Sequence, residues 1–359
     1  MASIWNNRIS VSIFGEAHGP AIGVTVDNLP PGEFIDIKKL HQFMERRSPG
    51  IHEGGEFNQI MSGILGDRTT GSPLCAFIQN TEPAQPDMSQ LNRLPRPGQA
   101  DYTGTMRYRG FNDVRDGGHF SDRLTAPLCF AGAVCGQILE RRGIYVGAHA
   151  LEIHGIRDEE FDQVKVDKEA ILAVRYKSFP VIKNARGKLM LEDIRAAQEG
   201  GESLGGIIEC AAVNVPAGIG SPIFDGLENS IAQLIFGIPG VRGLEFGAGF
   251  ETARMVGSQS NDSFYVDGHG HVKTHSNNHG GILGGISSGM PITLKVAIKP
   301  TASAAQPQES VNLSTMKTEK LEIENGCEAC IVPKVVPCVE ACVNIALLSH
   351  MMDYPHFCG

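Results

Sequence analysis

Apolar and polar residues alternate along several short stretches of the chain, as expected for β-strands with one buried face. The strictest alternation covers residues 290–298, at Met290, Ile292, Leu294, Val296 and Ile298. Residues 8–14 and 22–26 flank a tight turn with a glycine at each end, Gly15 to Gly19, which predicts a β-hairpin. Two further strands are predicted at residues 73–79 and 206–215.

Other stretches carry apolar residues at helical spacing. Residues 36–47 predict a helix with Asp36 as its N-cap. An apolar tract predicts a second helix at 121–141, which Pro127 should kink or delay. Two more helices are predicted at 221–236, beginning at Ser221 and Pro222, and at 335–352. Residues 95–118 are interpreted as a loop.

Strands and helices do not alternate regularly, so we expect an α+β fold in layers rather than a doubly wound parallel sheet. No repeat, low-complexity tract or long charged linker marks a boundary, so we expect one domain over residues 1–359.

Composition narrows the class of protein. Glycine supplies 43 of 359 residues, about 12% against an average near 7%, without a collagen period and beside 42% hydrophobic residues. This argues for a globular chain whose backbone closely approaches ligands or other backbone. The net charge of -9 and the absence of a basic run argue against a nucleic-acid partner.

No uncharged apolar stretch reaches about 18 residues, which argues against a membrane span. The N-terminal residues lack the pattern of a secretory signal, so we expect a cytoplasmic protein.

The 9 cysteines are an odd number in an intracellular chain, so a disulfide framework is not expected. Four of them lie in apolar or strand-like stretches and are predicted core residues: Cys75, Cys129, Cys135 and Cys210. A metal-binding module is an alternative, because Cys327 and Cys330 form a C-x-x-C pair and several histidines fall within residues 269–279. The spacing fits no zinc finger, and we expect no metal.

Four glycine-rich or basic islands separate the predicted elements. The first holds His18 in its glycine turn, where it suits general acid catalysis or is a plain surface histidine. The second holds Arg46 and Arg47 at a helix end, which either clamp carboxylate or phosphate or complement the helix dipole.

The third island spans residues 96–125 and combines glycines and His119 with five arginines, Arg96, Arg107, Arg109, Arg115 and Arg123. The fourth spans residues 276–289 and carries two pairs of glycines, followed by Lys299 at the end of the alternating strand. Paired glycines let the main chain approach a flat or phosphorylated ligand.

Together these islands resemble the signatures of the chorismate synthase family. The matching segments are Phe14-Gly-Glu-Ala-His-Gly19, Arg96-Pro-Gly-Gln-Ala-Asp-Tyr-Thr103, Gly257-Ser-Gln259 and residues 276–289. The match runs in the family's order from about Arg8 to Met352, and the glycine block makes it highly specific.

The resemblance implies a β-α-β sandwich of two antiparallel sheets around central helices, assembled as a homotetramer. It implies an anti 1,4-elimination of phosphate from 5-enolpyruvylshikimate 3-phosphate, which gives chorismate in the shikimate pathway of aromatic amino-acid biosynthesis. The family requires reduced FMN without net redox change. Clustered arginines suit such an anionic substrate in a chain of net charge -9.

The resemblance also implies site residues. The implied catalytic residues are His18, which would protonate the departing phosphate, and Glu328. The implied substrate-binding residues are Arg46, Arg47, Arg115 and Arg123. The implied contacts to FMN are Gln99, Ser121, Asp262, Gly284, Gly285, Lys299 and Thr301.

Several positions depart from the family pattern. Gln99 stands where the family has a second histidine, and an amide donates a hydrogen bond but no proton. His119 is therefore a third catalytic candidate, as a nearby imidazole. Ala17 replaces a serine, and near residue 326 the family's arginine and aspartate become Gly326 and Glu328, beside Cys327.

These departures leave open a flavin-binding paralogue with weak or altered activity. A nicotinamide-dependent flavin reductase is another alternative. The chain has no extra segment to hold NADPH, so we expect a monofunctional enzyme served by an external flavin reductase.

Overall fold

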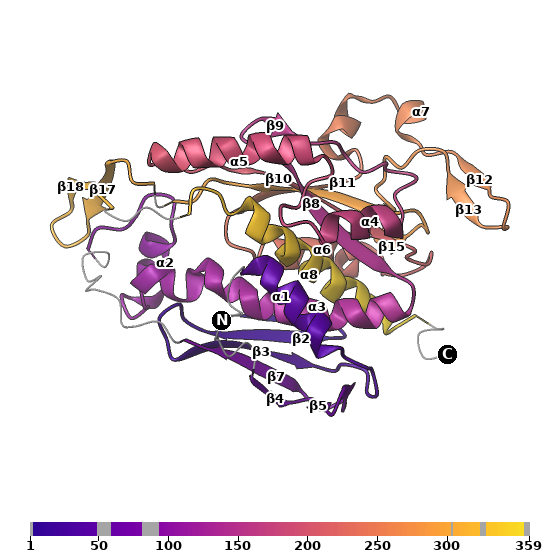
Figure 1. The fold of residues 1–359 in the computed structure, drawn as a ribbon, viewed down its shortest axis with the longest axis horizontal. Helices are drawn as coiled ribbons and strands as arrows, with labels where there is room; N and C mark the ends of the chain where they lie inside the picture. The colour runs from indigo at the N-terminus through magenta and orange to yellow at the C-terminus, as the bar shows by residue number, and fades with distance from the viewer. Residues whose placement is uncertain (1–2, 49–58, 81–92, 303, 324–327, 355–359) are drawn as a thin grey trace.

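Two five-stranded antiparallel sheets enclose a layer of helices (Figure 1). The computed structural model describes residues 3–48, 59–80, 93–302, 304–323 and 328–354. The first sheet has the order β1 (Ile4–Asn6), β2 (Ser10–Gly15), β3 (Ala21–Asp27), β7 (Leu74–Gln79) and β4 (Gln59–Ser62). The second has the order β11 (Val241–Phe246), β16 (Ile292–Ile298), β10 (Gly206–Val213), β8 (Tyr145–Ile153) and β9 (Ile156–Arg157).

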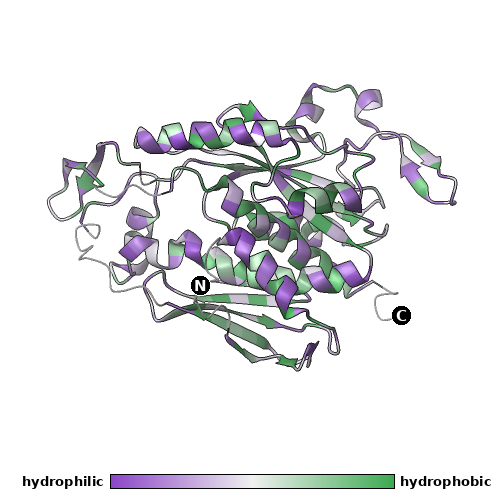
Figure 2. Ribbon diagram, in the orientation of Figure 1, coloured by the Kyte–Doolittle hydropathy of each residue, from purple (hydrophilic) through white to green (hydrophobic). Residues whose placement is uncertain are grey.

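The layer between the sheets contains α1 (Ile37–Arg47), α3 (Thr125–Arg141), α6 (Leu227–Ile235) and α8 (Val332–Met351). Helices α3 and α8 are hydrophobic on most sides because both sheets and neighbouring helices cover them (Figure 2). The two helices pack so closely that a Cβ on Gly132 would lie 2.2 Å from the Cβ of Ala341. Glycine at this crossing therefore allows the backbones to meet.

Helix α8 is long and apolar enough to cross a membrane, yet 89% of its most apolar window is buried in the core. Its hydrophobicity therefore reflects its place between the two sheets.

A further layer covers the outer face of the second sheet (Figure 1). It contains α4 (Lys168–Arg175) and α5 (Asn184–Glu199). Side chains of α4 pack on β10 around Phe161, Ile171 and Val213. The second sheet is thus buried on both faces.

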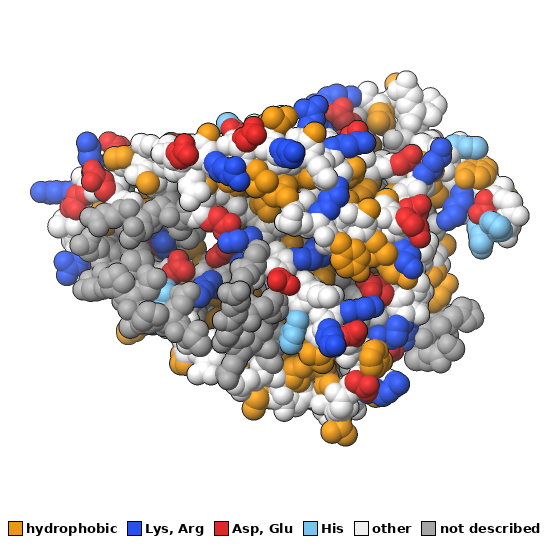
Figure 3. Space-filling model, in the orientation of Figure 1, with side chains coloured by type: hydrophobic (Ala, Val, Ile, Leu, Met, Phe, Trp, Pro, Cys, Tyr) orange, Lys and Arg blue, Asp and Glu red, His pale blue; other side chains and the backbone are white. Residues whose placement is uncertain are grey.

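Shorter elements fill the connections. They are β5 (Ile64–Leu65), β6 (Arg68–Thr69), α2 (Asp101–Tyr108), η2 (Arg115–Phe120), η3 (Asp122–Leu124), η4 (Ile223–Asp225), η5 (Gly249–Arg254), α7 (Gly257–Ser260), β12 (Phe264–Val266), β13 (Val272–Thr274), β14 (Ile282–Leu283), β15 (Ile286–Ser287), β17 (Gln308–Asn312) and β18 (Lys317–Leu321). Basic and acidic side chains are interspersed on the face shown in Figure 3.

The predicted α+β sandwich of antiparallel sheets is confirmed, as are the β2–β3 hairpin and the strand ending at Ile298. The predicted N-cap is also confirmed, because the carboxylate of Asp36 accepts hydrogen bonds from the backbone N of Lys38 (2.9 Å) and Lys39 (3.2 Å). Each of these features is fixed by residues close in sequence.

Other boundaries were wrong. The predicted loop at 95–118 contains helix α2. Helix α3 begins only at Thr125, which places Pro127 in its first turn, where proline causes no kink. The helix predicted from Ser221 begins at Leu227, because Ile223 has a left-handed backbone (φ 61°) and interrupts the helical path.

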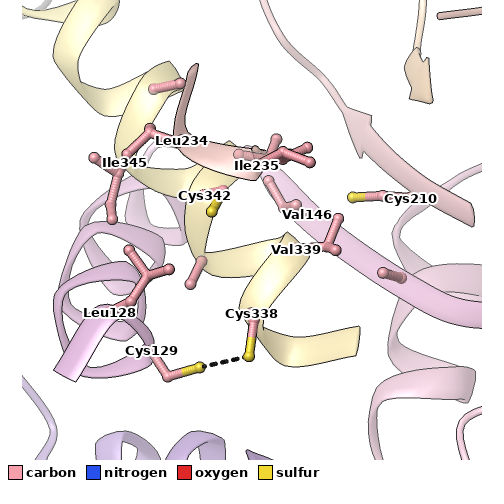
Figure 4. Close-up of a cluster of buried hydrophobic side chains, with 14 of the residues drawn as sticks. Leu128, Cys129, Val146, Cys210, Leu234, Ile235, Cys338, Val339, Cys342 and Ile345 are labelled. Atoms are coloured by element: carbon pink, nitrogen blue, oxygen red, sulfur yellow. Dashed lines mark hydrogen bonds between the residues drawn. The ribbon is translucent and has the colours of Figure 1, made fainter. Parts of the chain in front are cut away.

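The core contains most of the described cysteines (Figure 4). Cys129, Cys135 and Cys210 are buried as predicted, whereas Cys75 is only half-buried in β7. The Sγ atoms of Cys129 on α3 and Cys338 on α8 lie 3.6 Å apart. Cys327 lies outside the described residues.

Candidate active site

A cavity of about 650 Å³ opens where one edge of the helical layer meets both sheets. Its walls come from the end of α1, the ends of β3 and β7, residues 96–99 and 116–126, the segment after β16, and the start of α8. Cations outnumber acids in this lining. The cations are Arg47, Arg96, Arg123, Lys299 and Lys334, and the acids are Asp116, Asp122 and Glu328.

Arg47 is a buried cation at the end of α1, only 6% exposed. Its Nε donates to Thr125 Oγ1 at 2.6 Å, and its Nη2 lies 2.8 Å from the carbonyl oxygen and 3.2 Å from the carboxylate of Asp122. Burial opposes the charge, but Cys338 and Asp122 favour it, and the pKa of Arg47 is raised. A fixed guanidinium of this kind is suited to hold a phosphate or carboxylate.

The loop that carries Gln99 is anchored by a buried ion pair. Arg96 donates to Asp101 through Nε (2.7 Å) and Nη2 (2.9 Å), and the backbone N of Arg96 donates to the same carboxylate at 3.0 Å. Both side chains are at most 5% exposed. This clamp holds the loop across the first turn of α2, so that Gln99 lines the cavity.

A sharp reversal in η2 decides which side chains reach the cavity. Asp116 (φ 46°), Gly117 (φ 81°) and Gly118 (φ 54°) all have positive φ. Asp116 and Ser121 line the cavity, and the hydroxyl of Ser121 caps η3. A Cβ on Gly118 would lie 2.1 Å from the carbonyl oxygen of Asp113, so this turn requires glycine.

The same reversal turns His119 away from the cavity. Its Nδ1 lies 2.7 Å from the carbonyl oxygen of Gly15, and its Nε2 lies 2.6 Å from Ser3 Oγ. Nδ1 therefore donates and Nε2 accepts, so both ring nitrogens are engaged. The structure does not bring the predicted catalytic imidazole of His119 to the cavity lining.

His18 is half-buried in the β2–β3 turn, next to Ala17, which lines the cavity. Its Nε2 is buried without a hydrogen-bond partner among the described residues. Arg123 Nη1 donates to the carbonyl oxygen of Ala17 at 3.1 Å, which ties this turn to the cavity wall.

Lys299 and Thr301 follow β16 and line the cavity. Lys299 Nζ donates to the carbonyl oxygen of Gly98, and burial together with Arg242 lowers its pKa. Thr301 Oγ1 donates to the carbonyl oxygen of Glu328 at 3.1 Å, and the carboxylate of Glu328 pairs with Lys334 at 2.6 Å. Predicted residues from distant parts of the chain thus line one cavity, among them Gln99, Ser121, Lys299, Thr301 and Glu328. Gly326 lies outside the described residues.

Two predicted substrate arginines lie elsewhere. Arg46 points towards α8 and forms a bidentate pair with the fully buried Glu340, at 2.6 and 2.7 Å. Arg115 is exposed and pairs with Asp113 at 2.7 Å. Neither of them lines the cavity.

Three predicted cofactor residues lie at the far end of the second sheet. Gly284 and Gly285 form the turn between β14 and β15, with φ of 63° and 85°, as a two-residue hairpin requires. Asp262 accepts hydrogen bonds from Ser276 Oγ (2.6 Å) and from the backbone of residue 278 (2.9 Å). The length of β16, about 20 Å at 3.3 Å per residue, separates this region from Lys299.

The cavity residues fit a flat ligand with an anionic group. Apolar side chains of Ile22, Ile78 and Phe120 line the cavity together with the cations, and the volume is ordinary for a cofactor-sized ligand. The sequence motifs missed Asp116, Asp122 and Lys334 as lining residues. Nothing local in the sequence marks Lys334, because the packing of α8 places it.

Among the described residues no group of three or more His, Cys, Asp or Glu side chains is arranged to hold a metal ion. The exposed histidines 269 and 271 lie in the turn between β12 and β13.

Comparison with known proteins identifies relatives over the full length of the fold. The family model described as chorismate synthase matches residues 9–352. A chorismate synthase of Korarchaeum cryptofilum is 39% identical over 356 residues, covering 97% of each chain. One of Thermococcus kodakarensis is 39% identical over 350 residues, covering 96% of each chain.

A solved structure titled "Crystal Structure of Chorismate Synthase" superposes with a TM-score of 0.73 at 26% identity, covering 97% of this chain and 92% of the other. The cation-rich cavity suits a small anionic ligand. The family match identifies the chain as a phosphate lyase. The chain belongs to the chorismate synthase family, whose activity forms part of the shikimate pathway and uses reduced FMN.

Proposed function

We propose that this chain releases phosphate from 5-enolpyruvylshikimate 3-phosphate and forms chorismate, with reduced FMN bound in the cavity. The observation that carries the proposal is the buried, fixed guanidinium of Arg47 in a cation-rich cavity of about 650 Å³. Reduced FMN, when bound, supplies electron density to the breaking C–O bond without net redox change.

The residues of the chain divide the remaining tasks. Arg47 and Arg123 would hold substrate anions, and Lys299 and Thr301 would hold the phosphate end of FMN beside the Gln99 loop. Gln99 and Ser121 would donate hydrogen bonds to the cofactor. His18 would protonate the departing phosphate, since its buried Nε2 has no competing partner among the described residues.

The test is an anaerobic assay with chemically reduced FMN that follows phosphate release and chorismate formation. Production of both supports the proposal, and the absence of product at saturating substrate contradicts it. His18→Ala should lose about 10²–10⁴-fold in rate while FMN binding persists. If His18→Ala keeps full rate, His18 has no catalytic role.

The paralogue with weak or altered activity remains a second candidate, because an amide occupies the cavity wall at Gln99. Phosphate release from a different enol-ether substrate, without chorismate formation, would favour it.

We further propose a cytoplasmic homotetramer served by a separate flavin reductase, with residues 1–359 acting as one domain. One hydrophobic core that spans both sheets supports the single domain. Since β16 separates Gly284, Gly285 and Asp262 from Lys299, these residues would reach the cofactor of another subunit. Light scattering tests the assembly, and a fully active monomer would exclude it.

A further inference from the structure

Three acids line the cavity, and one of them has no partner among the described residues. Asp122 pairs with Arg47 at 3.2 Å, and Glu328 pairs with Lys334 at 2.6 Å. The carboxyl of Asp116 forms no hydrogen bond or ion pair with any described residue. A half-buried carboxylate without a donor is poorly stabilised.

The backbone conformation of Asp116 is strained. Its φ of 46° and ψ of 36° lie in the left-handed region, which residues other than glycine seldom adopt. Strain of this kind is common at functional sites. Here it places the carboxyl in the cavity wall while His119 is turned away.

The turn that follows Asp116 lies beside Gln99. A Cβ on the next residue, Gly117, would be 3.8 Å from Gln99 Nε2, and both Asp116 and Gln99 line the cavity. An amide supplies no proton, and both nitrogens of His119 are engaged. This part of the wall therefore has one acid that is free to hold a proton.

We propose that Asp116 becomes a neutral carboxylic acid when reduced FMN binds and then donates a hydrogen bond to the anionic ring of the reduced flavin beside Gln99. This rests on the proposed function, because it assumes that the cavity binds reduced FMN. When the anion binds, the carboxyl takes up one proton from solvent; no electron moves and no covalent bond to the ligand forms.

The charges around Asp116 agree with this role. Burial and the negative charge of Asp122 raise the pKa of Asp116, against the opposing effect of three basic neighbours. Those neighbours are His18 in the β2–β3 turn, Arg96 before α2, and Arg123 in η3. The more distant cavity charges are Arg47, Lys299, Glu328 and Lys334.

The experiment compares the binding of reduced and oxidised FMN across pH 6–9 by anaerobic calorimetry, in buffers of different ionisation enthalpy. Both forms carry the same phosphate, but only the reduced ring is an anion. For the wild type, the affinity for reduced FMN should fall about tenfold per pH unit above the titration of Asp116, with proton uptake on binding. Oxidised FMN should not show this additional fall.

Asp116→Asn should abolish the additional fall and the proton uptake. Asp116→Gly should do the same. Glycine adopts this left-handed backbone without strain, so this variant still tests the proposal if Asp116→Asn misfolds. Asp122→Asn is the matched control: it should keep the additional fall and the proton uptake, but the fall should begin at lower pH, because the charge of Asp122 raises the pKa of Asp116. The proposal is overturned if Asp116→Asn titrates like the wild type, if both forms of FMN show the same pH dependence, or if reduced FMN does not bind. If reduced FMN binds with this pH dependence but no chorismate forms, the proposed role of Asp116 is supported and the proposed function is contradicted.

Discussion

Arg46 and Arg47 are neighbours in sequence at the end of α1, yet they contact different parts of the fold. Arg46 is held by the buried carboxylate of Glu340, whereas Arg47 faces the cavity. The arginine pair that looks like one anion clamp in the sequence thus consists of a structural residue and a binding residue.

Arg46→Ala should destabilise the fold by about 3–5 kcal/mol, because it leaves Glu340 buried without its cation. Chemical denaturation measures the loss. Arg46→Ala combined with Glu340→Gln should recover part of it, and an unchanged free energy of unfolding for the single variant would contradict the structural role.

Arg47→Lys should raise KM for the phosphorylated substrate. Expressed as RT ln of the KM ratio, this effect should exceed the loss in free energy of unfolding. Lysine keeps the charge but loses the fork that contacts Thr125 and Asp122. Steady-state kinetics with saturating reduced FMN measure KM. An unchanged KM would place the substrate anions elsewhere.

Asp101→Asn should weaken FMN binding and lower stability by about 3–5 kcal/mol, because it breaks a buried pair that fixes the Gln99 loop. Asp113→Asn breaks the more exposed pair with Arg115 and is the matched control, with an expected loss below about 1 kcal/mol. Flavin fluorescence titration and thermal unfolding separate the two effects. Equal losses in both variants would show that the buried clamp has no special role.

Gln99→His should increase the rate of chorismate formation if proton supply near Gln99 limits turnover. The gain should be larger in the Asp116→Asn background, where the imidazole would replace the missing acid. Single-turnover kinetics provide the comparison. No gain in either background would show that this wall does not limit the rate.

The surroundings of His149 predict that the stability of the fold depends on pH. It is fully buried between Glu209, 2.8 Å from Nε2, and Asp158, 3.6 Å from Nδ1. Burial opposes protonation, but the nearby carboxylate of Asp158, the hydrogen bond to Glu209 and the negative charges of both carboxylates raise the pKa of His149. Its stabilisation is therefore complete below the unfolded pKa, about 6.5, and is lost as pH rises through the folded pKa.

His149→Gln should therefore lose less stability relative to the wild type at pH 9 than at pH 6. Urea denaturation at both pH values measures this difference. A loss that does not depend on pH would mean that His149 is neutral in the fold.

The sequence predicted those features that depend on local residues. The N-cap at Asp36, the β2–β3 hairpin and the alternation of β16 each rest on neighbours in the chain. Helices α4 and α5 were missed, because tertiary burial on the second sheet determines them.

Sequence motifs located only part of the candidate active site. Motifs name residues without saying where side chains point, and Arg46 and His119 show the consequence. Both lie beside cavity residues in sequence but contact other parts of the fold. Asp116 escaped notice because its importance depends on the partners that it lacks.

The contact between Gly132 and Ala341 gives the cavity a weak point far from its lining. Thr125, which holds Arg47, and Lys334, which holds Glu328, lie on the two helices that meet there. A methyl group at Gly132 would push these helices apart and shift the two halves of the binding surface. A substitution at Gly132 could therefore inactivate the enzyme although Gly132 contacts no ligand and no charged residue is replaced.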